Sequence, residues 1–159
     1  MSYRIYFLFF LTLALSGCQK NFSTGEAGKL MANLEDMNGN PLTLSESEDQ
    51  KLLLHFWGTW CKPCLEELPA LVRAEETLEE NKFRVILVSE ESAEDIASYL
   101  NKKGIPLESA RYIGALTELQ IHALPATFVF NEHGDKIFNK SGRIAWDSEE
   151  EIQQILTLD

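Results

Sequence analysis

Two closely spaced cysteines, Cys61 and Cys64, constrain this chain more than any other feature of its sequence. They follow an apolar run, residues 51–57, that reads KLLLHFW and is typical of a buried central strand. Helical spacing of apolar residues begins at the first cysteine and continues to about residue 80. The sequence therefore places both thiols where a buried strand passes into a helix, which is the arrangement of an α/β domain.

The rest of the sequence extends this α/β pattern. Strands are predicted at residues 83–88, 107–112, 126–130 and 136–139, helices at 93–103, 115–120 and 147–158, and an N-terminal β-hairpin over 31–44 around the Asn38-Gly39 turn. Ser92 is expected to cap the second helix and Asp147 the last one, each with an acidic residue three positions later. We therefore predict an α/β sandwich with a central mixed β-sheet flanked by helices.

The N-terminus resembles an export signal. Residues 1–17 combine one basic residue, a short apolar segment and small residues at the end, which is the layout of a signal peptide. The apolar segment is shorter than the roughly 20 residues that span a bilayer. Residues 15–18 resemble the lipobox of bacterial lipoproteins, which implies lipidation of Cys18; a simple cleaved signal is the alternative. Residues 18–29 are then a flexible lipidated tether, and residues 30–159 the folded domain.

The charge of the chain excludes one class of partner. It carries 14 basic and 25 acidic residues, a formal net charge of −11. A nucleic-acid surface needs clustered Lys and Arg, so no nucleic-acid partner is expected.

The chain has three cysteines, too few for a small fold that is held together mainly by disulfides. With Cys18 as the membrane anchor, the other two remain as one working pair.

The position of this pair favours reversible dithiol chemistry. A helix N-terminus offers unpaired N–H groups and a partial positive charge, which stabilise a thiolate at Cys61. Lys62 adds a cation and is expected to lower the pKa of Cys61 further. Pro63 falls in the first turn, where a missing N–H costs nothing. Cys64, one turn into the helix, can reach Cys61 and resolve a mixed disulfide.

At this point a family resemblance is visible. Residues 56–64, FWGTWCKPC, resemble the active-site segment of the thioredoxin superfamily, and of its membrane-anchored TlpA/ResA/DsbE-like branch above all. Pro69 resembles the proline that kinks the active-site helix, residues 124–127 resemble the cis-proline loop, and Gly142 resembles the glycine before the final helix. The resemblance implies a thioredoxin-like fold with an N-terminal hairpin and an inserted helix. It implies a thiol–disulfide oxidoreductase without metal or external cofactor, because the redox group is the Cys61–Cys64 disulfide.

The same resemblance suggests which residues form the site. Cys61, Cys64 and Glu67 would be catalytic, with Glu67 tuning the dithiol in reducing members of the branch. Trp60, Lys62, Pro63, Leu124 and Pro125 would contact the substrate. For Glu67 the alternative is a solvated helix carboxylate.

His55 departs from the pattern, because thioredoxin has a buried Asp there that accepts the proton of the resolving cysteine. A histidine can titrate near neutral pH and so with the dithiol. The alternative, which we favour from the sequence, is a core histidine bonded to the backbone.

Together these features predict an extracytoplasmic, lipid-anchored enzyme that reduces disulfides in proteins. The resemblance suggests a membrane electron donor of the DsbD or CcdA type, and cytochrome c maturation or general periplasmic reduction as the role. An oxidase or isomerase would use the same four-residue site and is the alternative. Lys62 favours an oxidising couple, whereas a buried carboxylate at Glu67 would favour a reducing one. A copper(I) chaperone with Cys61, Cys64 and His122 as ligands is a less favoured alternative.

Overall fold

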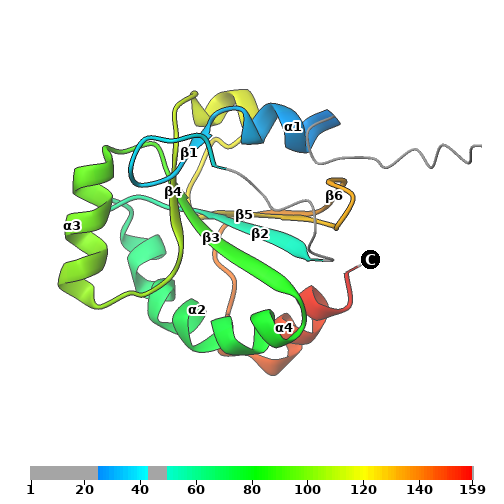
Figure 1. Ribbon diagram of the computed structural model, residues 1–159. Coiled ribbons are helices and arrows are strands. Elements are labelled where there is room, and N and C mark those ends of the chain that lie inside the picture. The colour runs from blue at the N-terminus through cyan, green and yellow to red at the C-terminus, as the bar shows by residue number, and fades with distance from the viewer. Residues whose placement is uncertain (1–24, 43–49, 159) are drawn as a thin grey trace, which may run out of the picture.

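A computed structural model describes residues 25–42 and 50–158 (Figure 1). The expected signal peptide, the lipidation site at Cys18 and residues 43 and 44 of the expected hairpin lie outside the described residues. None of the helices within the described ranges is both long enough and apolar enough to cross a bilayer.

The fold is built on one six-stranded mixed sheet, as the sequence predicts. Its strands are β1 (Leu34–Glu35), β2 (Lys51–Phe56), β3 (Phe83–Ser89), β4 (Ser109–Tyr112), β5 (Ala126–Phe130) and β6 (Lys136–Ser141), in the order β1-β4-β3-β2-β5-β6. Its helices are α1 (Gly25–Met31), α2 (Lys62–Glu80), α3 (Ala93–Lys103), α4 (Glu149–Leu156) and the 3₁₀ helix η1 (Leu116–Leu119). Strands β2, β3 and β4 run parallel to one another, whereas β1, β5 and β6 are antiparallel to their neighbours.

Strand β2 divides the core because its side chains alternate between the two faces of the sheet. Leu53 points into a core that contains residues of α2, α3 and α4, which we call the α2-side core. Leu52 and Leu54 point into a second core that contains residues of α1 and η1, the α1-side core. Figure 1 shows α2 and α4 together on one side of the sheet and α1 on the other. His55 shares the parity of Leu53, so its side chain lies under α2.

The cap of α3 and the ends of most elements agree with the prediction. The hydroxyl of Ser92 accepts a hydrogen bond from the backbone N–H of Asp95, and Gly104 ends α3 in the left-handed region at φ 63°. Helix α2 begins directly after Cys61, and Pro63 lies in its first turn. These signals depend only on neighbouring residues, which is why the sequence reveals them.

Two expectations about the ends of the chain are wrong. Residues 25–29, expected to be flexible tether, form most of α1, because Ala27 and Leu30 bury their side chains in the α1-side core. The cap of α4 is Ser148 rather than the residue before it, since its hydroxyl accepts from the backbone N–H of Glu151.

The expected hairpin, by contrast, is present as far as the structure describes it. An antiparallel bridge joins Glu35 to Pro41, and the backbone N–H of Leu42 donates to the carbonyl oxygen of Leu34 at 2.8 Å.

Candidate active site

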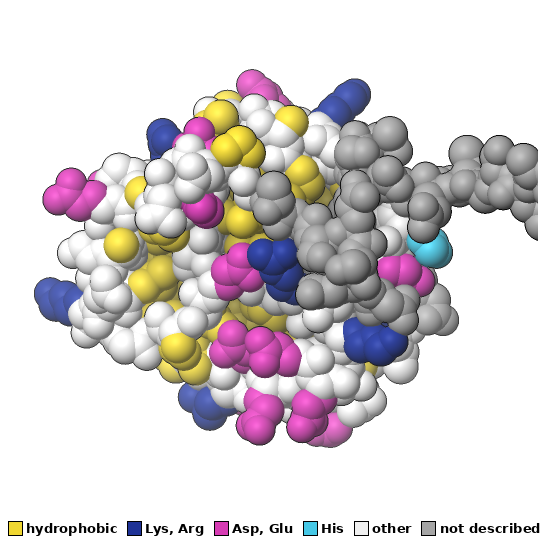
Figure 2. Space-filling view, in the orientation of Figure 1, with side chains coloured by type: hydrophobic (Ala, Val, Ile, Leu, Met, Phe, Trp, Pro, Cys, Tyr) yellow, Lys and Arg dark blue, Asp and Glu magenta, His cyan; other side chains and the backbone are white. Residues whose placement is uncertain are grey.

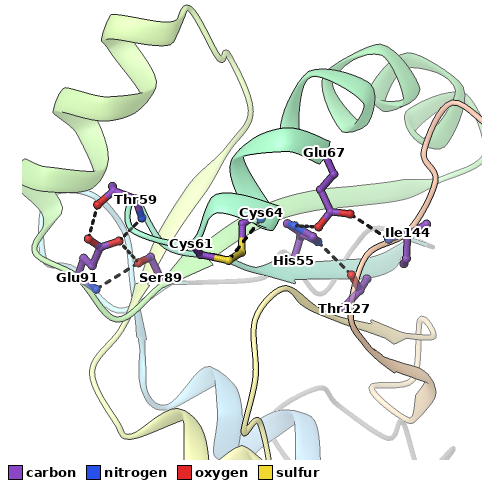
Figure 3. Close-up of a disulfide and its surroundings, with 9 residues drawn as sticks. All are labelled: His55, Thr59, Cys61, Cys64, Glu67, Ser89, Glu91, Thr127 and Ile144. Carbon is purple, nitrogen blue, oxygen red and sulfur yellow. Dashed lines mark hydrogen bonds and ion pairs between the residues drawn. A yellow bond between two sulfur atoms is a disulfide. The ribbon is translucent and has the colours of Figure 1, made fainter.

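Cys61 and Cys64 form a disulfide at the junction of β2 and α2 (Figure 3). The sulfurs are 1.96 Å apart and the Cα atoms 5.3 Å apart. Cys61 is the N-cap of α2, and its Sγ accepts a hydrogen bond from the backbone N–H of Cys64 at 3.3 Å. A thiolate at Cys61 would accept the same bond, so the helix end stabilises the nucleophilic form of this sulfur. The structure thus brings together the two predicted thiols.

Glu67 lies one turn after Cys64 and is buried, with 2% of its surface exposed. Its Oε2 accepts a hydrogen bond from the backbone N–H of Ile144 at 2.9 Å. The alternative of a solvated carboxylate is therefore wrong. Glu67 is thus a buried carboxylate on the helix that carries Cys64, and its role in the dithiol chemistry stays a prediction.

His55 is fully buried and contacts side chains from two other elements. Its Nδ1 is 3.0 Å from the hydroxyl of Thr127 on β5, its register partner in the sheet. Its Nε2 is 3.3 Å from Oε1 of Glu67. The expectation of a histidine bonded to backbone is therefore wrong, because both ring nitrogens face side chains. Figure 3 shows the imidazole between Glu67 and Thr127.

Glu91 is a site residue that the sequence reasoning missed. Its carboxylate accepts hydrogen bonds from the backbone N–H and the hydroxyl of Thr59, both at 2.6 Å, and from the hydroxyl of Ser89 at 3.2 Å. These bonds join the end of β3 to the loop that precedes Cys61 (Figure 3). A usable signal was present, since the carboxyl ends of parallel strands meet at one edge of a sheet.

The predicted substrate-contacting residues divide into exposed and buried ones. Trp60 is 67% exposed, and Lys62 and Pro63 are exposed beside it, as a contact surface requires. The Leu124–Pro125 peptide bond is cis; Leu124 is partly exposed and Pro125 buried. Substrate contact by these five residues stays a prediction.

Three further residues bear on the interior of the site and on the copper alternative. Trp57 and Trp146 are buried in the α2-side core. His122, the third ligand of the copper hypothesis, is exposed. Among the described residues, no group of three or more His, Cys, Asp or Glu is arranged to hold a metal ion.

A family model described as the AhpC/TSA family matches residues 27–135, more than half of the chain. The chain belongs to the AhpC/TSA family. The match spans both active-site cysteines, Glu67, Glu91 and the cis-proline loop.

Curated relatives of this family member are named for the same chemistry. Thiol-disulfide oxidoreductase ResA of Halalkalibacterium halodurans is 27% identical over 84% of this chain and 79% of its own length. ResA of Bacillus subtilis is 29% identical over 64% of this chain and 58% of its own length. The chain is therefore a thiol–disulfide oxidoreductase of the ResA type, and the predicted resemblance is confirmed.

Solved structures confirm the fold. The crystal structure of StoA from Bacillus subtilis superposes with a TM-score of 0.61 at 21% identity, covering 78% of this chain and 98% of that one. The predicted thioredoxin-like fold is thus confirmed.

Proposed function

We propose that this oxidoreductase reduces disulfides of proteins outside the cytoplasm. The observation that carries the direction is the burial of Glu67 one turn after Cys64. A buried carboxylate disfavours a second negative charge nearby and so makes the dithiol give up its electrons more readily. Lys62 opposes this weakly, because its side chain is 88% exposed and its ammonium lies 3.9 Å from the carboxylate of Glu66.

In the proposed reaction, the Cys61 thiolate attacks one sulfur of a substrate disulfide. A mixed disulfide forms and the other substrate sulfur leaves as a thiolate, which takes a proton from water. Cys64 then loses its proton and attacks Sγ of Cys61. The Cys61–Cys64 bond forms, the bond to substrate breaks, and the second substrate sulfur leaves. Two electrons pass to the substrate, and the product is the disulfide state described above.

A reductase outside the cytoplasm needs a supply of electrons, because such compartments are kept oxidising. We propose that a membrane electron donor of the DsbD or CcdA type re-reduces the disulfide. Residues 1–17 would act as a lipoprotein signal and Cys18 as the lipidated N-terminus, supported by the lipobox-like sequence at 15–18. Apocytochrome c and other periplasmic proteins are the proposed substrates.

Insulin reduction tests the mechanism. The full chain in detergent, with Cys18→Ser so that only the active pair reports, should reduce insulin disulfides with dithiothreitol as electron source. Cys61→Ser should abolish the activity. Cys64→Ser, the matched single-thiol control, should accumulate the mixed disulfide, visible as a mass increase. Equal activity in all three proteins would refute the mechanism.

Two further measurements test direction and location. Titration of the Cys61–Cys64 couple against dithiothreitol should give a potential nearer to thioredoxin than to DsbA; the reverse result would exclude the reductase. Cys18→Ala should move the chain from the membrane to the soluble fraction and leave insulin reduction intact. A chain that stays in the membrane after this change would exclude the lipid anchor.

A further inference from the structure

Two buried polar atoms next to the dithiol face each other without forming a hydrogen bond. Nε2 of His55 and Oε1 of Glu67 lie 3.3 Å apart, and neither has a hydrogen-bond partner among the described residues. Both side chains are buried. Buried polar atoms are normally satisfied, so an exception calls for a reason, and catalysis is one of them.

The second polar atom of each side chain has a partner. Oε2 of Glu67 accepts from the backbone N–H of Ile144, and Nδ1 of His55 faces the hydroxyl of Thr127. A hydroxyl can donate to an unprotonated ring nitrogen or accept from a protonated one. Thr127 therefore satisfies Nδ1 in every protonation state of the ring. The remaining ring nitrogen can gain or lose a proton without leaving Nδ1 unpaired.

The surroundings of His55 isolate it from other titratable groups. On β3 its register partner is Leu87, and the ring of Trp146 approaches edge-on with the centroids 6.1 Å apart. On β6, two strands away on the same face, Lys140 pairs with Glu151 of α4 at 2.9 Å. Of the titratable side chains on these elements, Glu67 is the one in contact with His55, and Cys64 lies one turn before Glu67 on α2.

We propose that His55 is a positioning residue for proton transfer: through Glu67, it holds the proton that Cys64 gives up when the dithiol closes. The inference rests on the proposed dithiol mechanism. In the mixed disulfide, the S–H proton of Cys64 passes to Oε1 of Glu67, and the new thiolate attacks Sγ of Cys61. The proton is then shared with Nε2 of His55, and the departing substrate thiolate takes its proton from water.

Charge in the buried site supports this route. Before the transfer, a carboxylate and a neutral imidazole carry one negative charge beside a neutral thiol. After it, the pair is neutral and the negative charge is on Cys64, so the buried site never holds two negative charges. A second buried anion would be costly in a site of low dielectric constant. A carboxylate with an imidazole beside it holds the proton better than a carboxylate alone.

Ellman's reagent separates the two thiol steps of the full chain carrying Cys18→Ser. The first release of thionitrobenzoate reports attack by Cys61, and the second reports closure by Cys64. Each is followed against pH in wild type, His55→Asn and His55→Gln. Asn retains a polar group towards Thr127 and Gln retains one towards Glu67, but neither titrates. His133→Gln, in an exposed turn, is the matched control.

The His55 variants should keep the rate of the first release within about twofold of wild type and slow the second roughly tenfold at neutral pH. This is less than the roughly 10²–10⁴-fold of a complete general base, because Glu67 remains to accept the proton. The loss of rate on acidification should set in at lower pH than in wild type, and Glu67→Gln should remove this pH response. Second-release profiles that overlay wild type in folded variants would overturn the proposal. So would an equal slowing of both releases with no change of shape, which would indicate a structural role.

A measurement without any substitution keeps the test independent of folding. The imidazole nitrogen resonances of His55 at neutral pH should differ between the reduced and oxidised wild-type protein. Identical resonances in both states would overturn the proposal. Failure of insulin reduction with an intact second-release effect would instead refute the proposed substrate class and leave the role of His55 standing.

Discussion

Removing the Glu91 carboxylate should destabilise the protein at the loop that carries its nucleophile. Glu91→Ala deletes the acceptor of two hydrogen bonds from Thr59, each 2.6 Å long, and of one from Ser89 at 3.2 Å. Hydrogen bonds to charged groups contribute about 1.5–3 kcal/mol each. Thr59 and Glu91 are partly exposed, so water replaces part of the loss. We therefore expect the free energy of unfolding to fall by about 2 kcal/mol in total.

Urea unfolding of the oxidised chain measures this loss, with Glu90→Ala as the matched control. Glu90 is the exposed neighbouring residue, and its removal should change stability by no more than about 0.5 kcal/mol. Thr59→Val removes the hydroxyl and keeps the backbone N–H, so a double-mutant cycle with Glu91→Ala isolates one of the bonds. If Glu91→Ala lowers the free energy of unfolding no more than Glu90→Ala does, or if the cycle gives no coupling energy, the carboxylate does not stabilise this loop.

Three other substitutions probe separate parts of the structure. Trp60→Ala should raise KM for insulin but not for a small disulfide, and stability should be unchanged because the side chain is 67% exposed. Equal KM values for insulin in wild type and Trp60→Ala would exclude substrate contact by this side chain. Gly114→Ala should destabilise by roughly 1–3 kcal/mol in urea unfolding, because a Cβ there would lie 2.8 Å from the buried ring of Tyr112; wild-type stability would show that the ring moves aside. Hydrogen bonds from Asn40 hold the pKa of Asp36 below its usual value, so the ionised carboxylate stabilises the fold above about pH 4 and this effect is lost as pH falls further. Asp36→Ala should therefore reduce the loss of unfolding free energy on acidification below about pH 4. An unchanged pH dependence would show that these hydrogen bonds do not stabilise the fold.

The parts of the fold that local patterns encode could be predicted from the sequence. The apolar run ending at Phe56, the cap at Ser92 and the cysteine pair each lie within one short segment, and the structure has them where expected. The helix at 25–31 could not be predicted in this way. Its sequence, GEAGKLM, is rich in glycine, and burial of Leu30 against the sheet stabilises it.

The candidate site shows the same division. Its two thiols and Glu67 follow one another at intervals of three residues at the start of one helix, so a single short sequence motif contains all three. The partners of His55 and Glu91 depend on contacts between strands and loops far apart in the chain. Thr127 meets His55 only because β2 and β5 pair in one particular register, which no short-range pattern specifies.

The two edge strands of the sheet, β1 and β6, decide whether another chain can pair with it. A protein that exchanges disulfides meets unfolded chains, whose extended segments readily add to an open strand edge. On one side, β1 has only two residues and is followed by a bridge to Pro41, which has no N–H to donate. On the other, β6 carries Lys136 and Lys140 and faces a β-bulge in its pairing with β5. Both edges are thus poor templates for an added strand, which would let the proposed reductase bind a protein substrate through its sulfur without also pairing with its backbone.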